Sequence, residues 1–294
     1  MFNYSWEQLT KTIAEVVSQN VSGEIWNWLH ENTNQANTGR FNRTFAAIPS
    51  KTGKASVSIT NDQQKQIASL LPGFTIEGWP VDRLCRVWLL MQLDATDQQK
   101  YFRSIENLFL TADVNEQEAL YASLPVLAYP ELWAKRCAEG IRSNIGTVLQ
   151  TIICDNPYPS VYLDDKAWNQ LVLKAFFTEK PVHRIIGLDK RNNKELADTL
   201  VDYAHERWAA GRAINPQLWR GVGRFINENN FDDIKRVFDS TDKIEQAAAA
   251  LACNDANYTP AKELLQSHSR LADEIKNDRL TWWILGERYM TVLA

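Results

Sequence analysis

Apolar residues recur along most of the chain at the spacing that places them on one face of an α-helix. Between Ile141 and Ile153, apolar side chains fall at i, i+4, i+7, i+8, i+11 and i+12. Comparable stripes run through residues 168–176, 196–208 and 218–226. A stripe of this period buries one face of an amphipathic helix. The pattern therefore predicts an all-α protein.

The same periodicity predicts most of the remaining elements, and we expect no continuous strand after residue 62. The further expected helices lie near residues 5–19, 22–32, 61–71, 80–93, 97–111, 115–124, 242–253, 260–276 and 279–292.

Residues 33–60 interrupt the helical pattern with many Asn, Thr, Ser and Lys. Two short β-like runs, Thr44–Ile48 and Ala55–Thr60, flank a turn-like stretch at residues 50–54. A connection of this length is either a small hairpin or a functional loop. We expect a short irregular or β-hairpin-like insert near residues 40–60. This insert would divide an N-terminal piece, residues 1–60, from a helical body, residues 61–294, that forms one continuous domain.

A proline motif suggests an internal repeat. The pattern Pro-x-Leu-Trp occurs at Pro130–Trp133 and again, 86 residues later, at Pro216–Trp219, and Pro260 follows 44 residues after Pro216. Intervals near 43 match the roughly 40–47 residues of HEAT or armadillo helix pairs. The alternative is that prolines simply occupy first helical turns, where the missing N–H costs nothing. The repeat interpretation predicts an α-solenoid of the HEAT or armadillo kind, or stacked helical hairpins.

Charge and cysteine content narrow the function classes. The formal net charge is −4, spread along the chain, which gives no electrostatic footprint for nucleic acid. A nucleic-acid binder of the HEAT-like repair type therefore has little support.

The first residues lack a signal-peptide pattern and no window reaches 18 apolar residues, so we expect no membrane span. The four cysteines have neither zinc-site nor redox-motif spacing, which favours a reduced, cytoplasmic protein.

His205 is the first candidate for chemistry. On the expected helix 193–211, Asp198, Asp202 and His205 share one face, with Glu206 adjacent. His205 is a candidate general base, oriented by Asp202 or by a carboxylate on another helix, with Glu206 adjacent. The Asp202-x-x-His205 spacing also occurs in helical metal sites, but the chain offers no second pair of that kind, so we expect no metal and no cofactor. The alternatives are a solvated charged face and a His205 that caps a helix or forms a hydrogen bond between helices.

A second set of polar residues is a candidate binding cluster. Arginine presents a planar fork to anions and asparagine offers both a donor and an acceptor. Such groups either converge on a polar aromatic metabolite or bridge helix ends and buried carbonyls. The candidate binding residues are Arg142, Asn144, Asn169, His183, Arg184, His205 and Arg207.

The chain contains 11 tryptophans, most of them on apolar stripes. Core packing accounts for such positions, and a stacking platform for indole-like ligands is the alternative. The sequence carries no phosphate-binding loop, dinucleotide fingerprint, Gly-x-Ser-x-Gly elbow or His-Glu-x-x-His motif.

The most specific motifs are ordered through the centre of the chain. They are Asn115-Glu116-Gln117, Leu120-Tyr121, Leu124-Pro125-Val126-Leu127, Arg142-Ser143-Asn144, Asn156-Pro157-Tyr158-Pro159, Ala167-Trp168-Asn169-Gln170-Leu171, Gly187-Leu188-Asp189-Lys190-Arg191 and Tyr203-Ala204-His205-Glu206-Arg207-Trp208. As an ordered set they resemble the EboA family of bacterial proteins. The resemblance covers about residues 115–255, with weaker likeness in 51–59 and 79–90.

The resemblance implies a context, and no catalytic residues come with it. Genes of this family lie in a small operon associated with moving or processing secondary-metabolite precursors, indole-alkaloid pigments among them. We therefore expect a non-enzymatic helical scaffold or small-metabolite-binding protein. Its partners would be other proteins of that operon or a small indolic or isoprenoid metabolite. The alternative is an isomerase or hydrolase, acting on a prenylated or sugar-derived intermediate, with His205 as general base.

Overall fold

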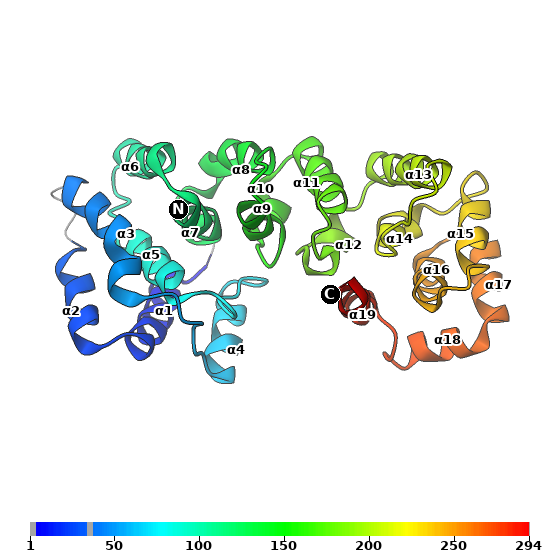
Figure 1. Ribbon diagram of the computed structural model, residues 1–294, viewed down its shortest axis with the longest axis horizontal. Coiled ribbons are helices and arrows are strands. Elements are labelled where there is room, and N and C mark those ends of the chain that lie inside the picture. Colours follow the sequence, from blue (N-terminus) through cyan, green and yellow to red (C-terminus); the bar gives the residue numbers. More distant parts are fainter. Residues whose placement is uncertain (1–3, 34–37, 294) are drawn as a thin grey trace. The chain divides into compact units, whose positions relative to one another are not determined.

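All regular secondary structure is helical in the part of the chain that the structure describes. The computed structural model describes residues 4–33 and 38–293. Within these residues the chain forms nineteen α-helices and four short 3₁₀ helices, and its β-type pairing is one isolated bridge between Ser56 and Pro80 (Figure 1). The all-α prediction is confirmed. The helical-repeat arrangement is compatible with this helical content and stays a prediction.

The chain divides into two compact units, residues 1–164 (unit 1) and residues 165–294 (unit 2). The helices of unit 1 are α1 (Trp6–Asn20), α2 (Gly23–Glu31), α3 (Thr38–Thr52), α4 (Asn61–Leu70), α5 (Val81–Met91), α6 (Gln98–Thr111), α7 (Val114–Ala122), η1 (Leu124–Val126), η2 (Pro130–Trp133), α8 (Ala134–Ile141), α9 (Gly146–Ile153) and α10 (Tyr158–Tyr162). The helices of unit 2 are α11 (Asp165–Phe177), η3 (Val182–Arg184), α12 (Leu188–Arg191), α13 (Lys194–Ala209), α14 (Leu218–Val222), η4 (Gly223–Phe225), α15 (Phe231–Phe238), α16 (Lys243–Asp255), α17 (Thr259–Ser267), α18 (Ser269–Lys276) and α19 (Trp282–Leu293). Residues on both sides of position 60 thus belong to unit 1. The division into 1–60 and 61–294, with the latter as one continuous domain, stays a prediction.

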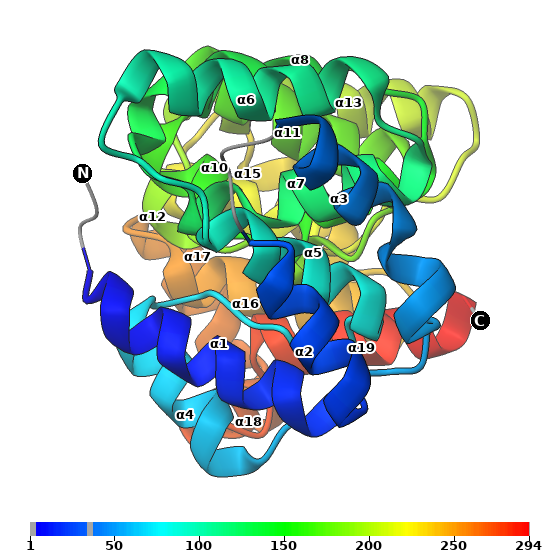
Figure 2. The same cartoon turned by 90° about the vertical axis from the view of Figure 1, so that its left-hand side faces the viewer.

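Helix α5 is the centre of unit 1. Every residue of this helix is buried except the half-buried Arg83. It packs against α1, α3 and α7 (Figure 2). Burying a side chain such as Leu84 or Leu89 contributes about 1.5–3 kcal/mol. A helix that is buried on nearly all sides is stable only when other helices pack around it, as α1, α3 and α7 pack around α5.

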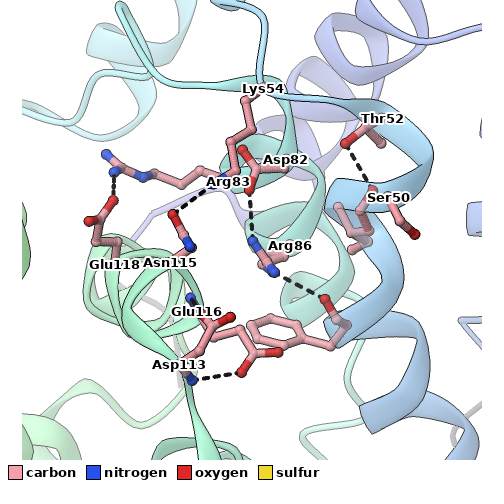
Figure 3. A network of polar contacts seen from close by, with 12 residues as sticks. Ser50, Thr52, Lys54, Asp82, Arg83, Arg86, Asp113, Asn115, Glu116 and Glu118 are labelled. Carbon is pink, nitrogen blue, oxygen red and sulfur yellow. Dashed lines mark hydrogen bonds and ion pairs between the residues drawn. The ribbon is translucent and has the colours of Figure 1, made fainter.

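One ion pair lies inside this core. Arg86 Nη1 donates to Asp82 Oδ2 at 2.8 Å, and Arg86 Nε donates to the carbonyl oxygen of Phe45 at 3.1 Å (Figure 3). The two charged side chains are 1% and 3% exposed. Asp82 Oδ1 accepts no hydrogen bond from the described residues. Because an unpaired buried charge costs several kcal/mol, each member of this pair needs the other.

The start of α7 is fixed by a capping box. Asp113 Oδ1 accepts from the backbone N–H of Glu116 at 2.8 Å, and Glu116 Oε2 accepts from that of Asp113 at 2.9 Å (Figure 3). Reciprocal bonds of this kind satisfy two N–H groups that the helix itself leaves free. Lys54 Nζ donates to Asn115 Oδ1 at 3.0 Å, which links the segment after α3 to the same helix end.

The expected β-like run Thr44–Ile48 is wrong, because these residues lie inside α3. Phe41, Thr44, Phe45 and Ile48 are buried, and their spacing of three and four residues is helical. This face packs against α5. The polar composition of the segment concealed a short amphipathic stripe, and the core contact with α5 decides its structure. Residues 34–37 lie outside the described chain.

The second expected run, Ala55–Thr60, is extended but pairs with a different segment. The backbone N–H of Val57 donates to Trp79 O at 2.8 Å, and the N–H of Val81 donates to Ala55 O at 2.8 Å. Of the stretch expected as a turn, residues 50–52 form the end of α3, and residues 53–54 lead into the extended segment; the residues described here contain no hairpin.

Two expected helices are each divided in two. The stripe from Ile141 to Ile153 is shared between α8, which ends at Ile141, and α9, which begins at Gly146. Between them the backbone N–H of Ile145 donates to Ser143 Oγ, a local bond that competes with helix. The expected helix 260–276 likewise breaks between α17 and α18.

Unit 2 is organised around α16. Its residues Ala247–Cys253 are all buried, and the helix contacts α14, α15, α17 and α19. Small side chains let the backbones of neighbours come close: a Cβ on Gly223 would lie 3.1 Å from Ala252 O. The alanine row thus lets one helix pack against several neighbours, η4 and α18 among them.

Within the described ranges, no helix is both long enough and apolar enough to cross a membrane. All four cysteines are buried and form no disulfide among the described residues, and burial raises the pKa of Cys85 to about 12. Such thiols act as small core hydrophobes.

Candidate functional site

His205 pairs with a carboxylate on another helix. Its Nε2 lies 2.8 Å from Asp233 Oδ1 of α15, and its ring stacks on Trp208 with centroids 5.8 Å apart. The imidazole is 52% exposed. Asp202 and Glu206 are exposed on α13 and have no bond to His205. The imidazole is thus oriented by α15, on the surface of unit 2.

Arg207 has a backbone partner. Its Nε and Nη2 donate to Ala213 O at 2.9 and 2.7 Å. This fork closes the turn that follows α13.

Asn169 and His183, two of the polar candidates in unit 2, have separate partners. Asn169 is buried and exchanges two amide hydrogen bonds with Asn193, the N-cap residue of α13, at 2.8 and 3.2 Å. His183 Nε2 lies 2.7 Å from Glu287 Oε1 of α19. Arg184 follows His183 in η3. These contacts connect helix ends, and the structure does not gather the residues around one hollow.

Burial lowers the pKa of His183, and the neighbouring Glu287 opposes this shift. The ring also fills the space above Gly286, where an added Cβ would lie 2.3 Å from His183 Cγ. Neutral His183 is therefore part of the packing between η3 and α19.

Arg142 and Asn144 belong to unit 1, where both are exposed between α8 and α9. Their convergence with the residues of unit 2 stays a prediction. Among residues 4–33 and 38–293, no group of three or more His, Cys, Asp or Glu side chains is placed to hold a metal ion.

Unit 1 contains an apolar pocket that these candidates do not line. Its volume is about 310 Å³, near the lower end of the range for small-molecule sites. We call it the proline–tyrosine pocket, because seven of its eleven lining residues are proline or tyrosine. The lining residues are Tyr4, Leu70, Leu71, Pro72, Pro125, Leu127, Pro130, Pro157, Tyr158, Val161 and Tyr162.

The walls of the proline–tyrosine pocket are rigid. The Tyr158 hydroxyl donates to Pro130 O, and the Tyr158 and Tyr162 rings stack with centroids 4.8 Å apart. Asn156 holds the start of α10, because its Oδ1 accepts from the backbone N–H of Tyr158 at 3.0 Å. Burial raises the pKa of Tyr158 above its usual range, so the hydroxyl stays protonated and remains a donor. The prolines fix their own backbone angles.

The lining determines what this pocket accepts. None of the eleven residues carries a formal charge. A charged group placed there would lose hydration without gaining a partner, whereas ring faces and aliphatic carbons gain contact. Val161 is 62% exposed, so one wall is open to solvent. The geometry therefore favours a neutral, flat or branched apolar molecule.

Two sequence motifs contribute to the walls of this pocket. Asn156-Pro157-Tyr158-Pro159 and Leu124-Pro125 were noted as motifs, and both contribute to the walls. Their proximity to residues 70–72 depends on tertiary packing, which no local pattern reveals.

Comparison with known proteins identifies the family. A family model described as "Metabolite traffic protein EboA" matches residues 9–223. The match begins at residue 9 rather than near 115 and ends at 223 rather than near 255, so it includes most of unit 1. No curated protein and no solved structure matches the chain. The chain belongs to the EboA family of metabolite traffic proteins.

Proposed function

We propose that this protein is a non-enzymatic binding protein that holds a neutral, apolar metabolite in the proline–tyrosine pocket. The class of ligand is a small molecule with an indole-like ring or a short isoprenoid chain. The observation that carries the proposal is the uncharged lining of a pocket of about 310 Å³. The family's description as metabolite traffic proteins supports the same role.

Carrying a metabolite requires loading and release. The exposure of Val161 gives the pocket an open side, and the stacked Tyr158 and Tyr162 give it a preformed inner wall. A preformed site costs less ordering entropy on binding. We place this activity in the cytoplasm, with the ligand passed to other proteins of the same pathway. The four buried cysteines form no disulfide among the described residues, which is in keeping with a reducing compartment.

The test is calorimetric titration of the whole chain with indole and with geraniol. We expect both neutral probes to bind. Val161→Arg adds a charge to the open wall and should weaken binding about tenfold or more, since each 1.4 kcal/mol is tenfold.

Leu110→Arg is the matched control. Leu110 lies on α6 of the same unit, is 74% exposed and does not line the pocket. This variant should bind both probes like the wild type. Equal loss in both variants, or no binding of either probe at millimolar concentration, would refute the proposal.

A further inference from the structure

Unit 2 contains a second hollow with a different lining. It has a volume of about 260 Å³, and its walls include Trp208, Ile214, Trp219, Arg236, Ser240 and Glu245. We call it the tryptophan–arginine pocket. Its residues come from the end of α13, the following loop, α14, the end of α15 and the start of α16.

The aromatic side of the tryptophan–arginine pocket is a stack held from several directions. The Trp208 and Trp219 rings lie nearly parallel, with centroids 5.8 Å apart. Trp219 is 1% exposed and therefore anchored in the core. His205, fixed by Asp233, stacks on Trp208. Indole faces held in this way form a firm surface for an aromatic or apolar group.

Two opposite charges line the same hollow. The Arg236 guanidinium lies 4.1 Å from the centroid of the Trp208 ring. Neither Arg236 nor Glu245 forms an ion pair or side-chain hydrogen bond within the described ranges. Most other arginines that contact an aromatic ring here, such as Arg86 and Arg136, also have a carboxylate partner. The pocket thus offers one free cation and one free anion beside an indole surface.

We propose that the tryptophan–arginine pocket binds an aromatic α-amino acid as its zwitterion. The ligand carboxylate meets the Arg236 guanidinium, whose planar fork suits a carboxylate. The ligand ammonium meets Glu245, and the Ser240 side chain is an additional polar contact in the wall. The aromatic ring packs against Trp208, the half-buried member of the tryptophan pair. This site goes beyond the proposed function, because no residue of the proline–tyrosine pocket takes part in it.

The charge balance separates this ligand from other classes. A phosphate or polyanion would meet one arginine and would be repelled by Glu245. A neutral molecule would leave both charges unpaired and partly dehydrated, which is unfavourable. A molecule that carries both charges a short distance apart satisfies both side chains.

The experiment compares three ligands that differ in charge alone. L-Phenylalanine carries both charges, 2-phenylethylamine lacks the carboxylate and 3-phenylpropionate lacks the ammonium. Titrated into the whole chain, phenylalanine should bind about tenfold or more tightly than either analogue, because each charge-assisted hydrogen bond is worth that much.

Two variants assign the charges. Arg236→Met should weaken phenylalanine and 3-phenylpropionate about tenfold and leave 2-phenylethylamine within about twofold. Glu245→Gln should weaken phenylalanine and 2-phenylethylamine and leave 3-phenylpropionate unchanged or tighter. Arg212→Met and Glu228→Gln, both exposed and outside the pocket, are the matched controls and should change nothing.

Several outcomes overturn the proposal: equal affinity for the three ligands, no binding at millimolar concentration, or equal loss in the control variants. Arg236→Gln, with the melting temperature measured, replaces the Met variant if that one is unfolded. Val161→Arg must leave phenylalanine binding unchanged and Arg236→Met must leave indole binding unchanged. The proposals for the two pockets can therefore be refuted independently of each other.

Discussion

The two pockets differ in what their walls leave unsatisfied. In the proline–tyrosine pocket of unit 1, eleven uncharged side chains line the hollow, and the Tyr158 hydroxyl among them is bonded to Pro130 O. In the tryptophan–arginine pocket of unit 2, Arg236 and Glu245 face the hollow with no ion-pair partner among the described residues. The first pocket selects by shape and apolarity, and the second selects by a pair of charges.

Each unit also contains an ion pair with one buried polar atom left unbonded. The Asp82–Arg86 pair of unit 1 lies inside the core, where Arg86 Nε also donates to Phe45 O and Asp82 Oδ1 accepts no hydrogen bond from the described residues. Arg220 of unit 2 forms a fork with Asp189, at 2.7 Å for both bonds, and its Nη1 is buried and unbonded in the described chain. Neither Asp82 nor Arg220 lines one of the two pockets, whereas Arg236 and Glu245 do.

The largest effect on stability should come from breaking the buried Asp82–Arg86 ion pair. Arg86→Met leaves the Asp82 carboxylate buried without a partner, which should lower the free energy of unfolding by about 3–5 kcal/mol. Asp82→Asn combined with Arg86→Met removes both charges and should recover much of the loss. Urea denaturation measures both variants, with the exposed Arg212→Met as control. If the free energy of unfolding of Arg86→Met alone lies within about 1 kcal/mol of the wild-type value, the ion pair does not stabilise the fold.

The next effect concerns close packing in unit 2. Gly286→Ala places a Cβ 2.3 Å from His183 Cγ and 2.5 Å from His183 Cβ, so η3 and α19 must move apart. Overpacking of this kind costs about 1–3 kcal/mol. Gly23→Ala is the control, since its Cβ meets nothing within 4 Å. Thermal unfolding should separate the two variants, and equal melting temperatures would contradict this account.

A smaller effect tests the rigidity of the proline–tyrosine pocket. Tyr158→Phe removes the bond to Pro130 O and should cost about 1 kcal/mol. Because the wall loosens, indole binding should weaken while phenylalanine binding stays unchanged. Fluorescence-monitored denaturation measures the free energy of unfolding, and titration measures the affinities for indole and phenylalanine. Unchanged stability and unchanged indole affinity would show that the hydroxyl bond does not hold the wall.

The smallest effect is a dependence of stability on pH in unit 2. The folded-state pKa of His183 is lowered from 6.5 mainly by burial, so below pH 6.5 the unfolded chain binds more protons than the folded one. Stability should therefore fall as the pH drops below 6.5. Glu287→Gln should deepen this fall, because Glu287 raises the pKa of His183. His183→Gln should reduce the dependence of stability on pH. If neither substitution changes that dependence, it does not come from His183.

The sequence predicted most of the fold because most helices carry a long apolar stripe. Helices α5, α13 and α16 lie within a few residues of their expected ranges. Helix α3 was missed, because its stripe of Phe41, Phe45 and Ile48 is short and surrounded by residues typical of loops. Periodicity also joined α8 to α9, since a stripe can continue across a break of a few residues.

The sites were harder to predict than the helices. The hypothesis for His205 allowed an orienting carboxylate either on its own helix or on another, and only the structure identifies it as Asp233 of α15. The proline–tyrosine pocket combines residues near positions 4, 71, 127 and 158, and nothing in the local sequence joins them. Trp219 was assigned to a core stripe, and the structure places it both in the core and in a pocket wall.

The central claim is that the proline–tyrosine pocket holds a neutral apolar ligand, and photoaffinity labelling tests it most directly. A neutral indole probe carrying a diazirine would be irradiated with the whole chain, and the labelled peptides mapped by mass spectrometry. We expect labels on residues 70–72 and 157–162, suppressed by excess indole and absent in Val161→Arg. Labels spread evenly over both units, or unaffected by indole, would contradict the claim.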